Sequence, residues 1–364
     1  MAERSEGLAH DDETHLAAAL EWLCLAQDVL EERSDAGGVS AGWSFEDGWL
    51  PGYPETTGYI IETFIDAAEA LECPDLIGRA HRMIDWELSL QHANGAFPGH
   101  YGEPGSKPVI FNTGQIIHGL LAGHSRLGRP ECLPAAMRAA GWLAEQQDSD
   151  GCWRRSQHND IPHTYDTRTS WALLRAGLIS HEAKLQSVAM RQLNWALQQQ
   201  DDDGWFANNA FTLGAAPFTH TIGYAISGFL ESGLLLGDDR YLCAARKAAR
   251  AVANIQRNDG WLAGAYGRNW TPKASYCCLT GVAQMAVNWA VLAVSCGDVE
   301  FANHARLALA YLKRHHRVTA RDAVIRGGMA GSYPIWGAYE RFCYPAWAAK
   351  FFADAVMLLG RIVT

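Results

Sequence analysis

One six-residue segment, His163-Thr-Tyr165-Asp166-Thr-Arg168, brings together an imidazole, a phenol, a carboxyl group and a guanidinium group. Such a set can exchange protons with a substrate and can bind an anionic part of it. We therefore predict Asp166 as the main catalytic carboxylate, Tyr165 as a proton shuttle and Arg168 as the contact for a substrate anion. His163 is predicted to bind substrate beside them.

Residues of the same chemical types recur at comparable places along the chain. Glu55 is the predicted partner carboxylate, and His220 is the alternative proton shuttle. Two carboxyl groups can hydrolyse a glycosidic bond, and a Tyr or His can move the proton in elimination or epimerisation of a uronate. The other predicted substrate-binding residues are Asn112, Trp49, Tyr276, Tyr333, Trp336, Glu340 and Arg341.

Structural roles remain open for three of these residues. Asp166 and Glu55 also fit as helix N-caps or first-turn acids, which stabilise a helix by roughly 1 kcal/mol. His220 also fits as a buried, hydrogen-bonded residue. The sequence alone does not choose between these roles and catalysis.

The elements that must position these residues form a repeat. Five segments that are apolar nearly all round begin at small residues spaced 56, 55, 54 and 58 apart, namely Gly58, Gly114, Thr169, Gly223 and Gly281. A degenerate sixth copy lies at 343–352. Such segments predict inner helices that are packed on every side.

Amphipathic segments alternate with these inner segments. Their apolar residues recur at intervals of three and four, and four of them end in a turn with a glycine followed by an aromatic residue, at Gly95, Gly151, Gly204 and Gly260. The alternation gives six outer-inner helix pairs of close to 58 residues, without an obvious polar capping repeat. We therefore predict an all-α fold, a single (α/α)6 toroid over residues 13–364, preceded by an N-terminal tail, residues 1–12.

The connections between the helices differ in length, which predicts the face that carries the functional site. Outer-to-inner loops run to about 20 residues, whereas inner-to-outer turns are short. Long loops on one face predict a functional site there. The inner-helix N-termini open onto the same face, where free N–H groups favour anions.

The amino-acid composition limits the kinds of partner and the location that we expect for this protein. The 364 residues are 48% apolar and 19% charged, which suits a large buried core, and the net charge of −10 disfavours a nucleic-acid partner. Nine cysteines without a CxxC pair predict reduced thiols. The N-terminus lacks a signal-peptide pattern and no apolar run reaches the roughly 18 residues of a membrane span, so a cytoplasmic protein is expected. No cofactor is predicted, and the oligomeric state is left open.

The outer-helix tails, as in Gln147-Asp-Ser-Asp-Gly151-Cys-Trp153, resemble the QW repeats of squalene-hopene cyclases and protein prenyltransferase β subunits. The six-pair organisation is also similar to that of six-hairpin glycosidases, polysaccharide lyases and uronate epimerases. The resemblance covers nearly the whole chain and implies a toroid. For Trp153, Trp205 and Trp261 it implies that they fasten outer helices.

Departures from these families favour the carbohydrate-active branch. The acid motif of terpene cyclases is incomplete here, because Asp148-Ser-Asp150 and Asp201-Asp-Asp203 are each followed by glycine. The zinc motif of prenyltransferases is matched solely by Asp150-Gly-Cys152, in an outer-helix tail. We therefore expect an enzyme of hydrolase, lyase or epimerase type that acts on an oligo- or polysaccharide, with uronate-containing substrates favoured.

Three alternatives stay open. One is a terpenoid cyclase-like or prenyltransferase-like enzyme. Another is a zinc enzyme, because lanthionine cyclases are also toroids and hold zinc with two Cys and one His; His220, Cys278 and Cys343 are the matching residue types here. The last is a glycan-binding protein without catalysis.

Overall fold

The computed structural model describes residues 10–103 and 105–360. Most of the predicted N-terminal tail, residues 1–9, lies outside the described residues, and the first described helix, α2, begins at Asp12. Six inner helices occur in the described residues: α3 (Pro54–Leu71), α5 (Ile110–Leu127), α7 (Thr167–Ile179), α9 (Thr219–Leu236), α11 (Leu279–Ser295) and α13 (Ala346–Gly360). Over the same part of the chain the outer helices are α2 (Asp12–Asp28), α4 (Pro74–Leu90), α6 (Cys132–Gln146), α8 (Ala183–Leu197), α10 (Asp239–Ile255) and α12 (Glu300–His315).

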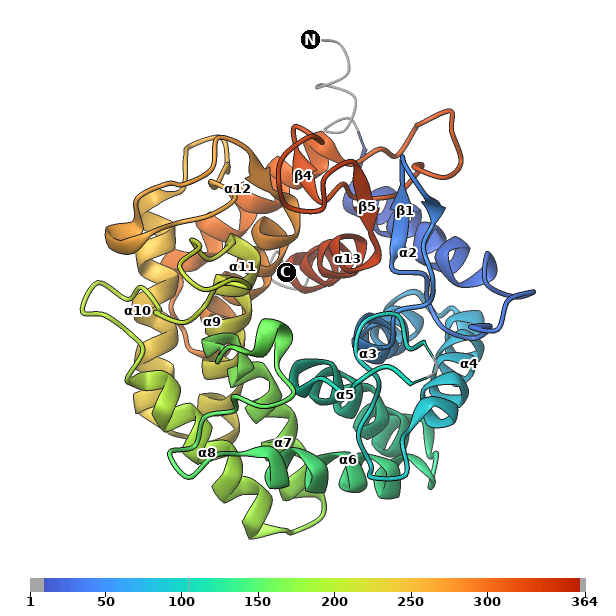
Figure 1. Cartoon of the computed structure of the whole chain (residues 1–364). Helices are drawn as coiled ribbons and strands as arrows, with labels where there is room; N and C mark the ends of the chain where they lie inside the picture. Colours follow the sequence, from blue (N-terminus) through green and yellow to red (C-terminus); the bar gives the residue numbers. More distant parts are fainter. Residues whose placement is uncertain (1–9, 104, 361–364) are drawn as a thin grey trace.

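The inner helices form a closed ring (Figure 1). Each packs against the next, and α13 packs against α3, so the first and last inner helices meet. Each outer helix after α2 packs on the inner helix that precedes it, while α2 packs on α13. The predicted (α/α)6 toroid is confirmed, with the closest pairs running from inner to outer helix.

Close helix contact explains the small residues of the repeat. A Cβ atom on Gly58 of α3 would lie 2.6 Å from Cα of Ile116 in α5, and one on Gly119 would lie 2.1 Å from the carbonyl oxygen of Gly58. The two backbones therefore touch at a distance that larger side chains prevent. Helix α5 is buried without interruption from Ile110 to Gly123, as the all-round apolar pattern predicts.

The repeated turns at the ends of the outer helices fasten neighbouring hairpins. Gly151 has a φ of +92°, a conformation that favours glycine. The Gln147 side chain donates to the carbonyl oxygens of Gly151 and of Val188 in the next outer helix. Trp153 is buried and its indole N–H donates to the carbonyl oxygen of Leu143. Trp153 therefore fastens this turn to its own outer helix, α6.

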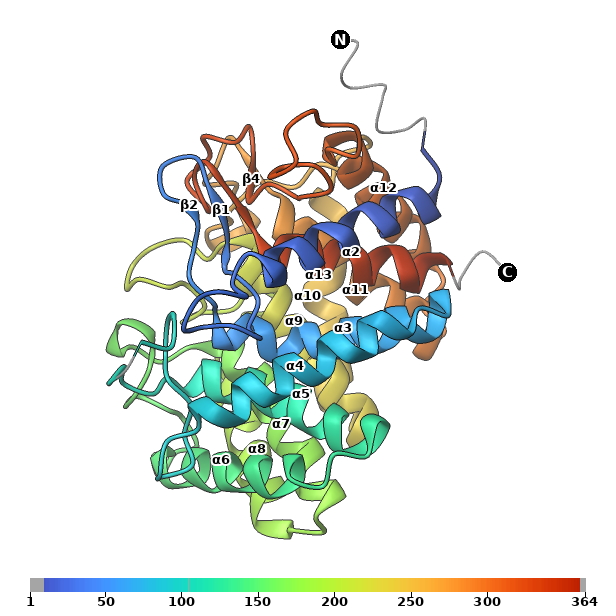
Figure 2. The ribbon, with the colours of Figure 1, turned by 90° about the vertical axis from the view of Figure 1, so that its right-hand side faces the viewer.

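Short strands link the long loops over one face. Strand β1 (Gly42–Ser44) pairs antiparallel with β2 (Gly48–Trp49) and with β5 (Cys343–Pro345), with Trp43 opposite both Trp49 and Tyr344. Strand β3 (Cys277–Cys278) pairs with β4 (Ser332–Tyr333). Figure 2 shows these loops at the left end of the molecule and the short turns at the right.

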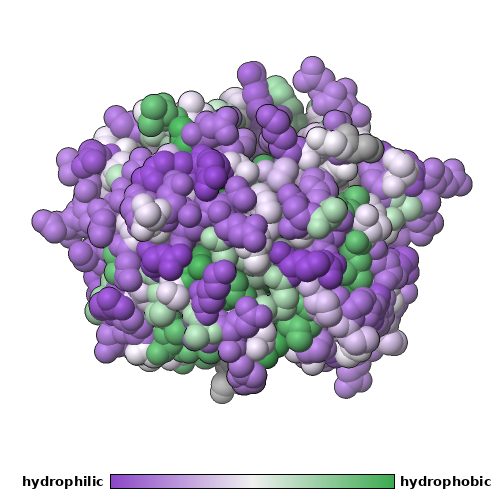
Figure 3. All heavy atoms as spheres, turned by 60° about the horizontal axis from the view of Figure 1, so that its bottom comes forward, coloured by the Kyte–Doolittle hydropathy of each residue, from purple (hydrophilic) through white to green (hydrophobic). Residues whose placement is uncertain are grey.

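The outside of the ring is polar, as the amphipathic pattern predicts. Figure 3 shows a largely hydrophilic face with smaller apolar areas between charged residues. Among the helices of the described segments, none is long and apolar enough to cross a membrane.

Candidate active site

A cavity of about 270 Å³ opens at the long-loop face, where the inner helices begin. We call it the mouth cavity. It is lined by Tyr53, Glu55, Tyr59, His100, Val109, Phe111, Asn112, His158, Tyr165, Phe211, His220, Tyr224, Tyr339, Glu340 and Trp347. Five of the predicted site residues are therefore brought together: Glu55, Tyr165, His220, Asn112 and Glu340.

Glu55 lies in the first turn of α3, directly after Pro54. The Tyr53 hydroxyl donates to Glu55 Oε2 at 3.0 Å. Burial raises the pKa of Glu55 to about 7, against the opposing effects of the Tyr53 hydrogen bond and the positive charge of Arg168. Both protonation states are therefore accessible near neutral pH, as a general acid or base requires. Helix α3 has no side-chain cap, so Glu55 does not serve as one.

Glu340 supplies a second carboxyl group to the same cavity. It lies in the loop between β4 and β5 with a φ of +46°. Burial raises its pKa to about 7 as well. The sequence predicted a substrate-binding role for Glu340, whereas its surroundings equally suit an acid or base.

His220 is the second residue of α9, and its neutral imidazole ring lines the cavity. Its Nδ1 lies 3.0 Å from Gln284 Oε1, and because an amide oxygen accepts, Nδ1 carries the proton and Nε2 keeps a free lone pair. Burial lowers the pKa of His220 to about 3. The ring packs against Tyr224 and Tyr339, with centroids 4.4 and 5.2 Å away. His220 therefore presents a neutral ring with Nε2 as a hydrogen-bond acceptor at neutral pH.

Tyr165 reaches the cavity from a 3-10 turn, Thr164–Asp166, that precedes α7. Burial raises its pKa well above 10, so its hydroxyl stays protonated. His163 stacks on the Tyr165 ring with centroids 4.4 Å apart and donates from Nε2 to the His158 carbonyl oxygen at 2.8 Å. His163 does not line the mouth cavity, and supports Tyr165 from behind.

Asp166 is placed differently from the prediction. It is 1% exposed and does not line the mouth cavity. Gln157 donates to its Oδ2, while its Oδ1 has no hydrogen-bond partner among the described residues. Burial raises the pKa of Asp166 to about 8, which leaves it mostly protonated at neutral pH. It also makes no capping hydrogen bond to α7.

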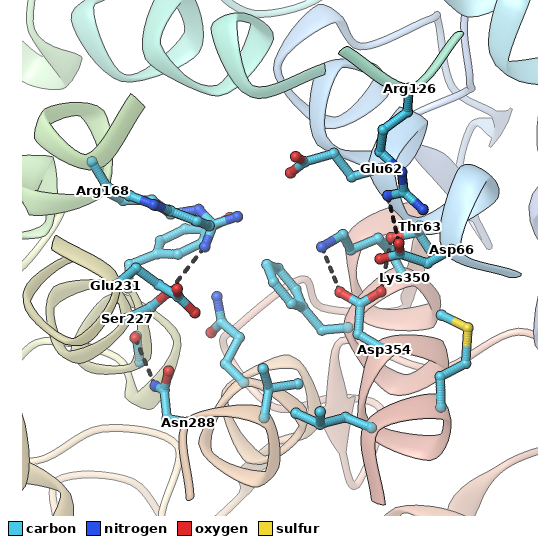
Figure 4. A pocket seen from close by; sticks show the side chains of 18 residues that line it. Glu62, Thr63, Asp66, Arg126, Arg168, Ser227, Glu231, Asn288, Lys350 and Asp354 are labelled. Carbon is cyan, nitrogen blue, oxygen red and sulfur yellow. Dashed lines mark hydrogen bonds and ion pairs between the residues drawn. The ribbon is translucent and has the colours of Figure 1, made fainter. Parts of the chain in front are cut away.

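Arg168 lines a second cavity, deeper in the ring than the mouth cavity (Figure 4). Its Nε donates to Gln115 Oε1 at 2.7 Å and its Nη1 donates to Ser227 Oγ at 3.1 Å. The guanidinium group lowers the pKa of Glu55 and of His220 through space. Arg168 is therefore an electrostatic neighbour of the mouth cavity without lining it.

The other predicted binding residues lie outside the mouth cavity. Trp49 packs on Trp22 with centroids 5.5 Å apart, and Tyr276 packs against Gly264. Tyr333 and Trp336 line a neighbouring groove, and Arg341 is exposed with its guanidinium group 5.1 Å from the centre of the Phe342 ring.

The zinc alternative is not supported by the geometry. The Gly281 N–H donates to Cys278 Sγ at 3.3 Å, so this thiol caps α11. Across residues 10–103 and 105–360, no three His, Cys, Asp or Glu side chains are gathered to hold a metal ion. His220, Cys278 and Cys343 are therefore not gathered into the set that the zinc alternative requires.

Several cavity residues were missed, and a simple signal finds some of them. Tyr59 and Tyr224 follow the predicted site residues Glu55 and His220 by four positions. Four residues make about one helical turn, so these rings lie one turn deeper on the same face. The residues His100, His158, Phe211 and Tyr339 come from long loops without a repeat signal.

Comparisons with known proteins agree with this architecture. The family model of the squalene-hopene cyclase C-terminal domain matches residues 55–228. A crystal structure of unsaturated glucuronyl hydrolase from Bacillus sp. GL1 has a TM-score of 0.73 at 16% identity, covering 96% of this chain and 98% of that one. The chain has the (α/α)6 toroid fold of that enzyme.

Two more solved structures share this fold. An unsaturated glucuronyl hydrolase specific for heparin has a TM-score of 0.76 at 12% identity, covering 97% of this chain and 98% of that one. Cellobiose 2-epimerase from Bacillus thermoamylovorans has a TM-score of 0.73 at 12% identity, with 96% and 98% covered. No curated protein matches the chain significantly in sequence.

Proposed function

We propose that this toroid is a carbohydrate-processing enzyme that cleaves a glycosidic bond at the mouth cavity, with Glu55 and Glu340 as acid and base. The observation that carries the proposal is the presence of two carboxyl groups in one cavity, each with a pKa of about 7. Glycoside hydrolysis needs one carboxylic acid to protonate the leaving oxygen and one carboxylate to activate water or attack the sugar.

The remaining lining suits a sugar. Phenol, imidazole and amide groups offer donors and acceptors for hydroxyl groups, and the rings of Phe111, Phe211 and Trp347 offer apolar faces. Among the described residues that line the cavity there is no Lys or Arg. A uronate would therefore be held there by neutral donors such as Asn112 and the tyrosine hydroxyls, and an uncharged sugar is accommodated equally well.

Sugar epimerisation is the second candidate. His100, His158 and His220 line the same cavity, and His220 is a neutral base. A neutral imidazole can remove a proton from a sugar carbon or its ring-opened form. This route uses the same cavity with His220, in place of the two carboxyl groups, as the proton carrier.

A screen against defined neutral and uronate-containing oligosaccharides tests the proposal. Hydrolysis produces new reducing ends, elimination produces ultraviolet absorbance from a new double bond, and epimerisation changes the sugar without either. We expect new reducing ends with the wild-type protein and with Glu21→Gln on the exposed side of α2, and none with Glu55→Gln. Product formation that survives Glu55→Gln but is lost in His220→Ala would replace hydrolysis by the second candidate.

A further inference from the structure

A second cavity, of about 300 Å³, lies deeper in the ring and extends from Tyr224 toward the ends of α3 and α13, away from the long loops. We call it the far cavity. Residues of α3, α7, α9, α11 and α13 line it, together with Arg126 of α5 (Figure 4). Its volume is at the lower end of those of small-molecule sites. Tyr224 and Gln284 separate it from the mouth cavity, because Tyr224 lines both and Gln284 lines this one while accepting from His220.

Most charges around the far cavity are already neutralised. Lys350 forms an ion pair with Asp354 at 2.5 Å, and Arg126 forms one with Asp66 at 2.6 Å. Glu62 forms an ion pair with Arg175 at 2.7 Å. A ligand gains little by competing for these groups.

Arg168 is the exception on the cationic side. It is 5% exposed, and within the described part of the chain it forms no ion pair. Its guanidinium carbon lies 5.3 to 5.9 Å from the rings of four aromatic residues, Tyr59, Trp171, Tyr224 and Phe351. Its hydrogen bonds to Gln115 and Ser227 go to neutral acceptors and use two of the five N–H groups of an arginine. A buried cation with unused donors is a strong site for a carboxylate.

Gln284 adds an independent sign of a ligand. This side chain is 3% exposed, and its Nε2 has no hydrogen-bond partner among the described residues. Because Gln284 lines the far cavity, a bound acceptor can satisfy this donor. Arg168 and Gln284 therefore offer N–H groups to the same space.

The same wall also contains oxygen acceptors, which require donor groups on a ligand. In Figure 4, Glu231 and Ser227 lie beside Arg168, and Asp354 faces them across the cavity. Glu231 forms no ion pair within the described residues, and burial raises its pKa to about 7. A ligand that fills this space must offer hydroxyl groups to these oxygens as well as an anion to Arg168.

We propose that the far cavity binds a free hydroxylated carboxylic acid of monosaccharide size, with its carboxylate on Arg168 and Gln284 and its hydroxyl groups on Glu231 and Ser227. This site is distinct from the mouth cavity and does not depend on the reaction there. The paired carboxylates around the rim disfavour a longer polyanion, so the ligand is a single small acid.

Calorimetric titration of the full chain with D-glucuronate tests the proposal, with D-glucose as the uncharged match and D-glucosamine as the cationic match. We expect one site for glucuronate, at least about tenfold tighter than for glucose, which is the value of one charge-assisted contact. Arg168→Gln should abolish this preference. Val287→Phe, which fills the cavity and leaves every charge in place, should abolish binding, while Glu55→Gln at the mouth should retain it.

Four results would overturn the proposal. The first is no binding of glucuronate to the wild type at concentrations up to about 10 mM, and the second is binding of glucose or glucosamine as tight as that of glucuronate. The third is glucuronate binding that survives both Arg168→Gln and Val287→Phe. The fourth is glucuronate binding that is lost in Glu55→Gln. Melting curves of each variant show whether it folds, and Val287→Phe keeps the test decisive if Arg168→Gln does not.

Discussion

The two cavities of the ring handle charge differently. At the mouth, Glu55 and Glu340 lie among phenol, indole and imidazole groups, and burial raises the pKa of each to about 7. At the far end, Lys350 and Asp354 form an ion pair. Among the described carboxyl groups that line that cavity, Glu231 alone has no ion pair, and burial raises its pKa to about 7, as it does for the two acids at the mouth. Groups that change protonation near neutral pH can transfer protons, whereas paired charges remain fixed. This difference supports the proposals of chemistry at the mouth and of ligand recognition at the far end.

The connections of the fold explain this difference. Long loops cover the mouth and bring aromatic residues such as Phe211 and Tyr339 over the starts of the inner helices, which removes water from the carboxyl groups there. At the far end the turns are short, and charged residues on neighbouring inner helices, such as Asp66 of α3 and Arg126 of α5, form ion pairs directly. Within the described residues, the mouth therefore has two acids without an ion pair, Glu55 on α3 and Glu340 on a loop, whereas most charges at the far end are paired.

The largest effect is expected from Glu55→Gln, because it removes a proton donor and acceptor while keeping the shape. Turnover of the substrate found in the oligosaccharide screen should fall by about 10²–10⁴-fold. The matched control is Glu21→Gln, which should keep the wild-type kcat. An equal loss in Glu231→Gln would break the assignment of chemistry to the mouth.

Asp354→Ala should lower the free energy of unfolding by about 3 kcal/mol, because it leaves the buried ammonium group of Lys350 without its carboxylate. Urea unfolding measures the loss. The double variant with Lys350→Met should recover much of it, since both charges are then gone. A single variant as stable as the wild type would show that the far-end pair is not a fixed structural charge.

Asp166→Asn should change how stability depends on pH. Burial raises the pKa of Asp166 from 3.8 to about 8 in the folded chain. A raised carboxyl pKa adds stability that is complete below pH 4 and is lost as the pH rises through 8, because the unfolded chain ionises first. The wild type should therefore lose roughly 4 kcal/mol more than the variant between pH 5 and pH 9, as measured by urea unfolding. Parallel curves would mean that Asp166 is ionised in the folded chain.

Phe211→Ala should have the smallest effect and should act mainly on KM. The ring lines the mouth cavity and meets Tyr165 edge-on with centroids 5.9 Å apart. Loss of one aromatic contact is worth about 1 kcal/mol, or roughly a fivefold rise in KM. Trp336→Ala serves as the control, because this exposed ring lies in the neighbouring groove. A larger effect in Trp336→Ala would move substrate binding toward that groove.

The repeat predicted the ring because its cause is local and periodic. Gly58 and Gly281 lie against the backbone of a neighbouring inner helix, where a larger side chain does not fit, so the spacing of the small residues reveals the architecture. The same register placed Glu55 and His220 at the mouth correctly. It failed at Asp166 because a 3-10 turn precedes α7 and presents Tyr165 to the cavity instead.

The repeat could not predict which loop residues line the mouth cavity. His100, His158 and Tyr339 reach the cavity from segments without periodic pattern, and their positions depend on contacts between segments distant in the chain, such as the pairing of β1 with β5. The far cavity was also not foreseen, because Arg168 has the same residue type whichever end of the ring it faces.

The dependence of kcat/KM on pH, measured on the best oligosaccharide substrate for the wild type and Glu55→Gln, tests the account most directly. The profile of kcat/KM reports the groups of the free enzyme. We expect a wild-type profile with limbs near pH 7, set by Glu55 and Glu340, and the loss of one limb together with most of the turnover in Glu55→Gln. A profile that is flat through pH 7, or one that Glu55→Gln leaves unchanged, would contradict acid-base chemistry at the mouth.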